Sequence, residues 1–164
     1  MLALLAAPSE LERAGPFAIN LNVASILAPE FQRFDAALPA VLRGEVTLDL
    51  LPADILSDPS AFLFARDFAR ARGFRLMLRG VTADVLPMFP LRLLGLDLIE
   101  LRWSRQMREV DLMDLARQVV LSRADTPDAI DWAAAQGIGF FKGAMAQAGR
   151  RFSAPARMEG ATTP

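Results

Sequence analysis

The sequence contains no cysteine and no histidine, and Lys142 is the single lysine among its 18 basic residues. Without cysteine the chain can form no disulfides, no zinc–thiolate sites and no thiol-based active site. Without histidine it lacks the residue that most often serves as general base or metal ligand near neutral pH. The net charge is −1 and no basic or acidic block occurs, so the charge pattern indicates neither nucleic acid nor a membrane surface as a partner.

No apolar run in the sequence is long enough to span a membrane. The opening residues 1–7 are apolar, but they are too few for the core of a signal peptide and no basic residue leads them. We therefore expect a cytoplasmic protein. The length of 164 residues suits one domain, which predicts a helical lead-in at 1–15, an α/β domain at 16–146 and a flexible tail at 147–164.

Short apolar runs alternate with helical segments along the chain. Two runs are rich in leucine and isoleucine, as strands buried on both faces are, and six strands are expected in all, at residues 17–22, 44–51, 74–80, 96–104, 118–123 and 138–141. Helices are expected at residues 28–38, 58–72, 107–115 and 126–136. This alternation predicts a parallel sheet with right-handed crossovers, and periodicity alone leaves an open sheet and a barrel as alternatives.

The helix at residues 58–72 has the clearest boundaries. Asp58-Pro59 combines a capping carboxylate with a proline at the first helical position, and Gly73 ends the helix. Its apolar stripe is predicted to face the sheet and to consist of Ala61, Phe64, Ala65, Phe68 and Ala71.

The succession of segments from about residue 17 to 146 resembles the EAL domain, a barrel-shaped phosphodiesterase module for cyclic di-GMP. Phe-Ala-Ile-Asn-Leu-Asn at 17–22 resembles the strand with the metal-binding asparagine, which corresponds to Asn20. Residues 74–80 resemble the strand that ends in an aspartate pair, and residues 96–102 the strand with the catalytic lysine. Residues 119–126 resemble the segment written Ala-Glu-Gly-Val-Glu-Thr in active members, and residues 136–143 resemble the closing segment with its glutamine-glycine. The resemblance implies a partial or modified TIM-barrel-like parallel sheet.

The positions that carry chemistry in active EAL domains are changed in this chain. Arg79-Gly80 replaces the aspartate pair, Glu100 the lysine, Ser122 a glutamate and Lys142 the closing glutamine. Two divalent cations require hard oxygen ligands, and an arginine at the bridging position would repel them. We therefore expect no metal, no cofactor and no phosphodiesterase activity.

One further family position has two alignments. Glu45 and Thr47 match the family's Glu-x-Thr, but the spacing from there to Asp58 is a few residues too long. The alternative alignment places Leu48 at the glutamate position.

The resemblance brings several polar residues to one end of the sheet as a candidate ligand or salt-bridge cluster: Asn20, Arg79, Glu100, Arg102, Arg123, Asp125 and Lys142. Arginine recognises phosphate through paired donors, which would make the cluster a nucleotide site. Alternatively, the basic residues neutralise Glu100 and Asp125 as a salt-bridge network. A third interpretation gives these two carboxylates acid and base roles in a hydrolase.

The connection after the third strand is the candidate partner surface, formed if exposed by Val85, Leu86, Met88 and Phe89, with packing in the interior as the alternative. The family's complete barrel has more than six strands, so we expect the open edges to be covered by the N-terminal helix, a second copy or another protein. The resemblance then implies a catalytically inactive regulatory or protein-interaction module in bacterial signalling. A receptor that holds cyclic di-GMP without cleaving it is the alternative.

Overall fold

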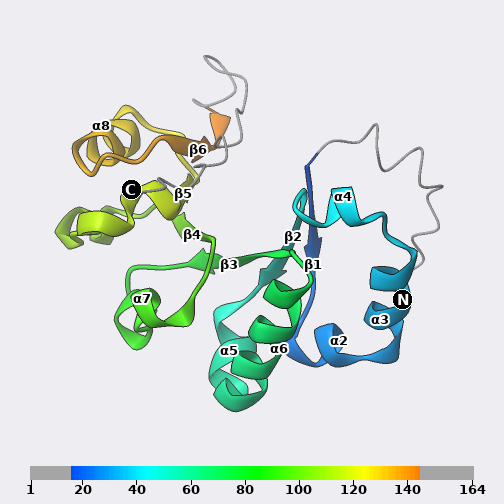
Figure 1. The fold of residues 1–164 in the computed structure, drawn as a ribbon. Helices are drawn as coiled ribbons and strands as arrows, with labels where there is room; N and C mark the ends of the chain where they lie inside the picture. The colour runs from blue at the N-terminus through cyan, green and yellow to red at the C-terminus, as the bar shows by residue number, and fades with distance from the viewer. Residues whose placement is uncertain (1–15, 145–164) are drawn as a thin grey trace, which may run out of the picture.

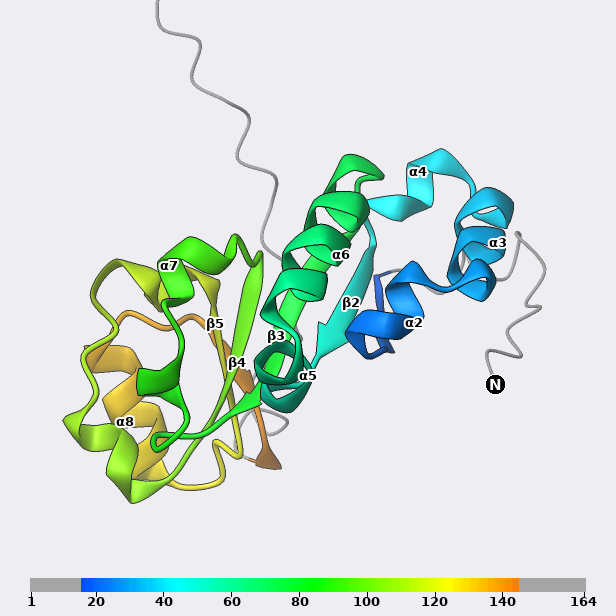
Figure 2. The ribbon, with the colours of Figure 1, turned by 90° about the horizontal axis from the view of Figure 1, so that it is seen from below.

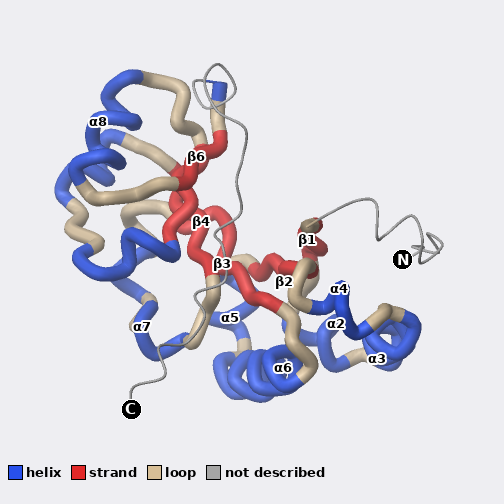
Figure 3. The backbone as a smooth tube through the Cα atoms, turned by 45° about the horizontal axis from the view of Figure 1, so that its top comes forward, coloured by secondary structure: helices blue, strands red, loops and turns tan. Residues whose placement is uncertain are grey.

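Six short apolar runs of the sequence form the strands of one parallel sheet in the computed structural model, which describes residues 16–144. The strands are β1 (Phe17–Asn20), β2 (Val46–Leu50), β3 (Arg75–Val81), β4 (Leu98–Arg102), β5 (Val119–Ser122) and β6 (Phe140–Lys142). Each strand pairs in parallel with the next one along the chain. The sheet curls into a half-barrel with the helices along its outer side (Figures 1 and 3), which confirms the predicted TIM-barrel-like α/β class.

The helices occupy the connections between strands, as expected for parallel pairing. They are α2 (Val23–Leu27), α3 (Pro29–Ala37), α4 (Ala40–Arg43), α5 (Pro52–Ser57), α6 (Pro59–Ala71), α7 (Leu91–Leu94) and α8 (Pro127–Ala135). The predicted helix start at Asp58 is confirmed, and the helix expected at 126–136 begins with a cap of the same kind. Asp58 Oδ1 accepts a hydrogen bond of 2.9 Å from Ala61 N, and Thr126 Oγ1 accepts one of 3.3 Å from Ala129 N.

Two expectations about helices need correction. The short helices α2, α4, α5 and α7 were not predicted. The segment predicted as one helix at 107–115 consists of two 3₁₀ segments, η2 (Arg105–Glu109) and η3 (Met113–Gln118); a third such segment, η1 (Leu86–Met88), lies after β3. The helix and tail expected at 1–15 and 147–164 lie outside the described residues.

The buried face of α6 is turned relative to the predicted stripe. Phe62, Ala65 and Ala69 are buried, whereas Phe64 is 64% exposed and Ala71 is exposed. Positions 62, 65 and 69 follow the i, i+3, i+7 spacing of one helical face. This face lies along β3 and beside α2 (Figure 2), and it buries the ring of Phe62 in place of Phe64.

The core fills the space between the helices and the outer face of the sheet. On β2, Leu48 and Leu50 belong to this core, and on β4 Ile99 and Leu101 do. Side chains alternate between the two faces of a strand, so the residues between them, Asp49 and Glu100, project to the inner, concave face of the half-barrel. The packing of the outer face therefore determines which polar side chains lie on the concave face of the half-barrel.

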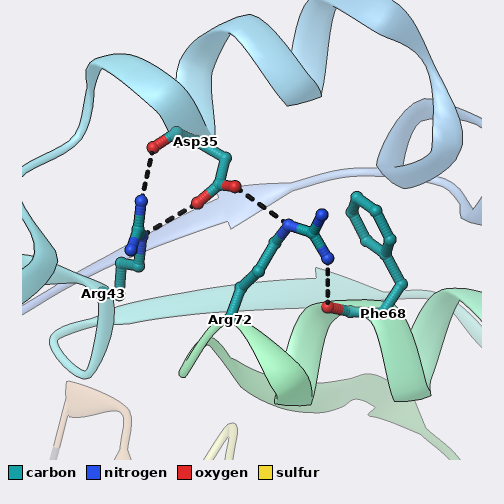
Figure 4. A network of polar contacts seen from close by, with 4 residues as sticks. All are labelled: Asp35, Arg43, Phe68 and Arg72. Carbon is teal, nitrogen blue, oxygen red and sulfur yellow. Dashed lines mark hydrogen bonds and ion pairs between the residues drawn. The ribbon is translucent and has the colours of Figure 1, made fainter.

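An ion-pair network around Asp35 holds the outer layer together at one end (Figure 4). Its carboxylate lies 2.8 Å from Arg43 Nε and 2.9 Å from Arg72 Nε, and Arg43 Nη2 donates a 3.0 Å hydrogen bond to the Asp35 carbonyl. The Arg72 guanidinium also lies over the Phe68 ring, 3.6 Å from its centroid. The network connects α3, α4 and the carboxyl end of α6.

Candidate functional site

The carboxyl end of β2 carries the most unusual polar group in the described part of the chain. Asp49 is only 6% exposed, and its Oδ1 atom has no hydrogen-bond partner among residues 16–144. Burial raises the pKa of Asp49 to about 6, against the opposing positive charges of Lys142 and Arg79 and with a smaller contribution from Glu100. A buried carboxylate with a free oxygen at the carboxyl edge of a parallel sheet marks the place where such folds hold ligands.

Residues from four other strands surround Asp49. Asn20 on β1 is its register partner across the first strand pair. Arg79 on β3, Glu100 on β4 and Lys142 on β6 are the groups whose charges act on its carboxylate. We call Asn20, Asp49, Arg79, Glu100 and Lys142 the cup.

One ion pair crosses the cup. Lys142 Nζ lies 2.9 Å from Glu100 Oε2 and donates a hydrogen bond to it, although β5 separates their strands. The Glu100 side chain is 12% exposed and that of Lys142 is 47% exposed. The chain's single lysine thus neutralises one carboxylate of the cup and acts electrostatically on the other.

A bulge on β3 positions Arg79. The register between β3 and β4 shifts between Leu78 and Val81, and Gly80 has a φ of +74°, a conformation that glycine adopts easily. Leu78 and Val81 both belong to the core on the outer face. The extra residue lets Val81 return to that face while Arg79 remains at the carboxyl edge, partly exposed.

Of the seven residues expected to cluster, four lie in the cup: Asn20, Arg79, Glu100 and Lys142. Arg102 is exposed at the end of β4, where its guanidinium approaches Gly80. Arg123 is exposed and has a φ of +57°. Asp125 is exposed, and its Oδ1 accepts a 2.6 Å hydrogen bond from Ala144 N after β6, so this side chain contacts the backbone that follows the last strand.

Asp49 is the site residue that sequence reasoning missed. The alignment question concerned Glu45 and Leu48, but Glu45 is exposed before β2 begins, and Leu48 lies in the core. The available signal was the single carboxylate inside the apolar run Val46–Leu50, near the carboxyl end of the strand. Ser122 is also buried on this side of the sheet, where its Oγ donates a 3.2 Å hydrogen bond to the Leu101 carbonyl.

The donor set of the cup does not fit a pair of divalent cations. Among residues 16–144, no three acidic, histidine or cysteine side chains lie together as a metal site would require. Glu100 is engaged by Lys142, which leaves the Asp49 carboxylate and the Asn20 amide as oxygen donors with Arg79 near them. Mg²⁺ and Mn²⁺ favour several hard oxygen ligands and are repelled by neighbouring positive charge.

The expected partner surface is mostly packed inside. Phe89 is buried, Val85 and Leu86 pack partly against the core, and Met88 is 62% exposed. Beside them lies an apolar pocket of about 390 Å³, lined among others by Leu91, Leu112 and Leu115. Nothing in the described residues indicates what would cover Met88. No helix between residues 16 and 144 is long and apolar enough to cross a membrane.

With this geometry in view, the chain can be compared with known proteins. No protein-family model matches the sequence, and no curated protein matches it either. The fold, by contrast, matches solved structures that contain EAL domains.

The first such structure is the S helix-GGDEF-EAL portion of Vibrio cholerae LapD bound to c-di-GMP, with a TM-score of 0.64 and 16% sequence identity over 84% of this chain and 38% of that one. The YkuI protein of Bacillus subtilis, which has an EAL domain and was solved with substrate c-di-GMP and calcium, gives a TM-score of 0.56 and 12% identity over 78% and 36%. A manganese/c-di-GMP complex of Klebsiella pneumoniae BlrP1 gives a TM-score of 0.57 and 17% sequence identity over 84% of this chain and 40% of that one.

The chain therefore spans about two fifths of the length of these structures. At such low identity the likeness shows a shared fold: the half-barrel is built as in proteins that contain EAL domains.

Proposed function

We propose that this chain is a catalytically inactive EAL-like domain that acts as a regulatory or protein-interaction module in bacterial signalling. The proposal depends on one observation, the 2.9 Å ion pair between Lys142 and Glu100 inside the cup. A lysine fixed on a carboxylate removes an oxygen ligand and adds a positive charge where metal-dependent phosphodiester hydrolysis would need cations. The fold likeness to LapD, YkuI and BlrP1 supports the placement in cyclic di-GMP signalling.

The residues of the cup also do not form an acid–base pair that could replace metal-dependent hydrolysis. No histidine occurs in the chain, and the buried Asp49 lies among positive charges rather than beside a second free carboxylate. Acid–base hydrolysis needs two carboxyl groups with separate roles. Because Lys142 binds Glu100, the cup supplies one free carboxyl group, that of Asp49.

The test is an assay for hydrolysis of cyclic di-GMP by the unaltered protein with Mg²⁺ and with Mn²⁺. We expect no linear dinucleotide above the level of a protein-free blank. Metal-dependent turnover that is lost in Asp49→Asn would refute the proposal, since it would show that the cup holds functional cations.

A second candidate is a receptor that binds cyclic di-GMP without cleaving it. The observation that favours it is the positive charge at the carboxyl edge, where Arg102 and Lys142 end β4 and β6 and Arg79 lies two residues before the end of β3. The solved structures of LapD and BlrP1 hold this nucleotide. Arginine pairs well with phosphate.

Calorimetric titration with cyclic di-GMP, with and without Mg²⁺, separates the two candidates. Binding tighter than about 10 µM, or about −7 kcal/mol, that is lost in Arg79→Ala/Arg102→Ala would establish the receptor. Arg117→Ala, which removes an exposed positive charge on η3 outside the cup, is the matched control and should leave such binding unchanged. No heat from the unaltered protein supports the interaction module.

A further inference from the structure

The solvent side of α6 carries large apolar side chains that do not belong to the core. Phe64 is 64% exposed and Leu63 is 44% exposed, and on the adjoining helix α5 Leu56 is 47% exposed. Helices α5 and α6 contact each other on the outer side of the half-barrel (Figure 2). Exposed apolar side chains that lie on neighbouring elements, unlike single scattered ones, are typical of interaction surfaces.

The exposed residues of α6 form one continuous face of the helix. From position 60 onward they follow the i, i+3, i+4, i+7 spacing of side chains on one side of a helix, and they are Ser60, Leu63, Phe64, Asp67, Arg70 and Ala71. The buried residues Phe62, Ala65 and Ala69 occupy the opposite side, toward the sheet. We call the exposed set the outer face of α6.

The two ends of this face carry opposite charges. Asp58, which caps the amino end, is exposed, and near the carboxyl end Arg70 is exposed although one of its donors binds the Gly95 carbonyl at 3.2 Å. When two such helices lie antiparallel, the acidic end of one meets the basic end of the other, and the helix dipoles also oppose each other favourably. A parallel pair would instead bring like charges together. The charge pattern therefore favours an antiparallel copy of the same helix as the occupant of this face.

We infer that a second copy of this chain packs on the outer face of α6, antiparallel, about a two-fold axis between Leu63 and Phe64. A two-fold contact is self-complementary, so one patch serves both copies. Leu63 of one copy then faces Phe64 of the other, and Ser60 faces Asp67. The inference rests on the proposed function as an interaction module and names one partner and the surface that it uses. Because α6 lies on the outer side of the sheet, the contact does not use the concave face that holds the cup.

Disulfide cross-linking of the full-length chain tests this arrangement, because the unaltered sequence has no cysteine that could interfere. A disulfide requires Cα atoms within about 7 Å of each other, so only positions that face each other across the contact join readily. Chains with Ser60→Cys mixed with chains with Asp67→Cys should form linked dimers on mild oxidation, seen on a non-reducing gel. Ser60→Cys chains alone should not, and Val41→Cys, at an exposed position on α4, mixed with Asp67→Cys measures random collision.

Phe64→Glu places a charge at the centre of the contact and should abolish the cross-link when it is added to both chains. Val41→Glu makes the same change at a residue that is 79% exposed on α4, and it should leave the cross-link unchanged. Far-ultraviolet circular dichroism checks that both variants are folded. Should Phe64→Glu fail this check, Phe64→Ser takes its place, since it removes the ring without adding a charge.

Cross-linking of the mixture at the level of random collision overturns the inference. So does a cross-link that survives a folded Phe64→Glu or Phe64→Ser, or one that Ser60→Cys chains form equally well alone, because neither agrees with an antiparallel contact centred on Leu63 and Phe64. Failure here leaves the proposed inactivity standing, since that is tested by hydrolysis with the unaltered chain.

Discussion

A single buried carboxylate gives the cup its pH dependence. Burial raises the pKa of Asp49 to about 6, above the ordinary value of 3.8 for aspartate. Between these two values the folded chain holds a proton that the unfolded chain releases. The protonated carboxyl therefore stabilises the fold fully below pH 3.8, and this contribution is lost as the pH rises through about 6.

Asp49→Asn should remove this dependence, because an amide of the same shape carries no charge to bury. One pKa unit corresponds to about 1.4 kcal/mol, and with screening by water and neighbouring charges we expect a gain of about 1–2 kcal/mol in unfolding free energy at pH 7.5. At pH 4 the variant and the unaltered chain should be nearly equal. Urea denaturation at both pH values measures the difference.

Asp131→Asn is the control, since it changes an exposed aspartate on α8. Its stability should follow that of the unaltered chain at both pH values. A loss of stability in Asp49→Asn at pH 7.5 would show that the charged carboxylate is well compensated, contrary to the free Oδ1 atom.

Sequence reasoning named four of the five residues of the cup but not Asp49. Arg79 was identified because it ends an apolar run, and strand ends in a parallel sheet share one edge. Glu100 and Lys142 were identified because the resemblance places them at positions that carry chemistry in the EAL domain. Asp49 was missed because one carboxylate in an apolar run gives no sign of which face it occupies until the outer core is known. Arg123 and Asp125 lie outside the cup because of the path of the backbone after β5, where Arg123 has a positive φ. The composition of the sequence does not predict this backbone conformation.

At the scale of the elements, strands were predicted better than the segments that join them. Apolar runs bounded by turn residues mark strands through burial alone, and proline after a capping residue marks α6 and α8. The helices α2, α4, α5 and α7 have four to six residues, too few to show a period. The prediction of the buried face of α6 was wrong because Phe62 and Phe64 fit an apolar stripe equally well. Packing of the helix against α2 and β3 decides which of the two rings is buried.

The Asp35 network should be a large local contribution to stability. Asp35→Asn leaves the guanidinium groups of Arg43 and Arg72 without their carboxylate, and both are partly buried. We expect a loss of about 1–3 kcal/mol, measured by urea denaturation at pH 7. Glu30→Gln breaks the exposed Arg33–Glu30 pair and should change stability by less than about 0.5 kcal/mol. Equal small effects would mean that the network contributes no more than a surface pair.

The end of β6 should be sensitive to one added methyl group. A Cβ at Gly143 would lie 2.7 Å from Ala124 N and 2.9 Å from Ala124 C, and backbone atoms cannot yield as a flexible side chain does. Gly143→Ala is expected to cost about 1–3 kcal/mol and to loosen the strand that carries Lys142. Gly139→Ala is the matched control, because no described residue lies within 4 Å of its Cβ position. Thermal unfolding followed by circular dichroism measures both, and equal melting temperatures would contradict the expected clash.

At the scale of the whole molecule, the half-barrel has two edges. Within residues 16–144, β1 pairs with β2 alone and β6 with β5 alone. Phe17 N and Leu21 N donate to carbonyls of Glu45 and Asp49. Because alternate residues of a strand in a parallel sheet donate to the same neighbour, the N–H groups of Ala18 and Asn20 point away from β2. Unpaired edges of this kind favour pairing with another strand.

We therefore predict association, and Ala18→Pro tests whether it uses β1. Size-exclusion chromatography with light scattering at low micromolar concentration should give a mass above the 17.9 kDa of one chain. Proline at position 18 removes a donor that faces away from β2, and edge strands tolerate it, so the fold should remain while association through this edge weakens. Ala18→Thr keeps the N–H group and should associate like the unaltered chain. A monomer before any substitution contradicts the prediction, and association unchanged by Ala18→Pro assigns it to a surface other than the β1 edge.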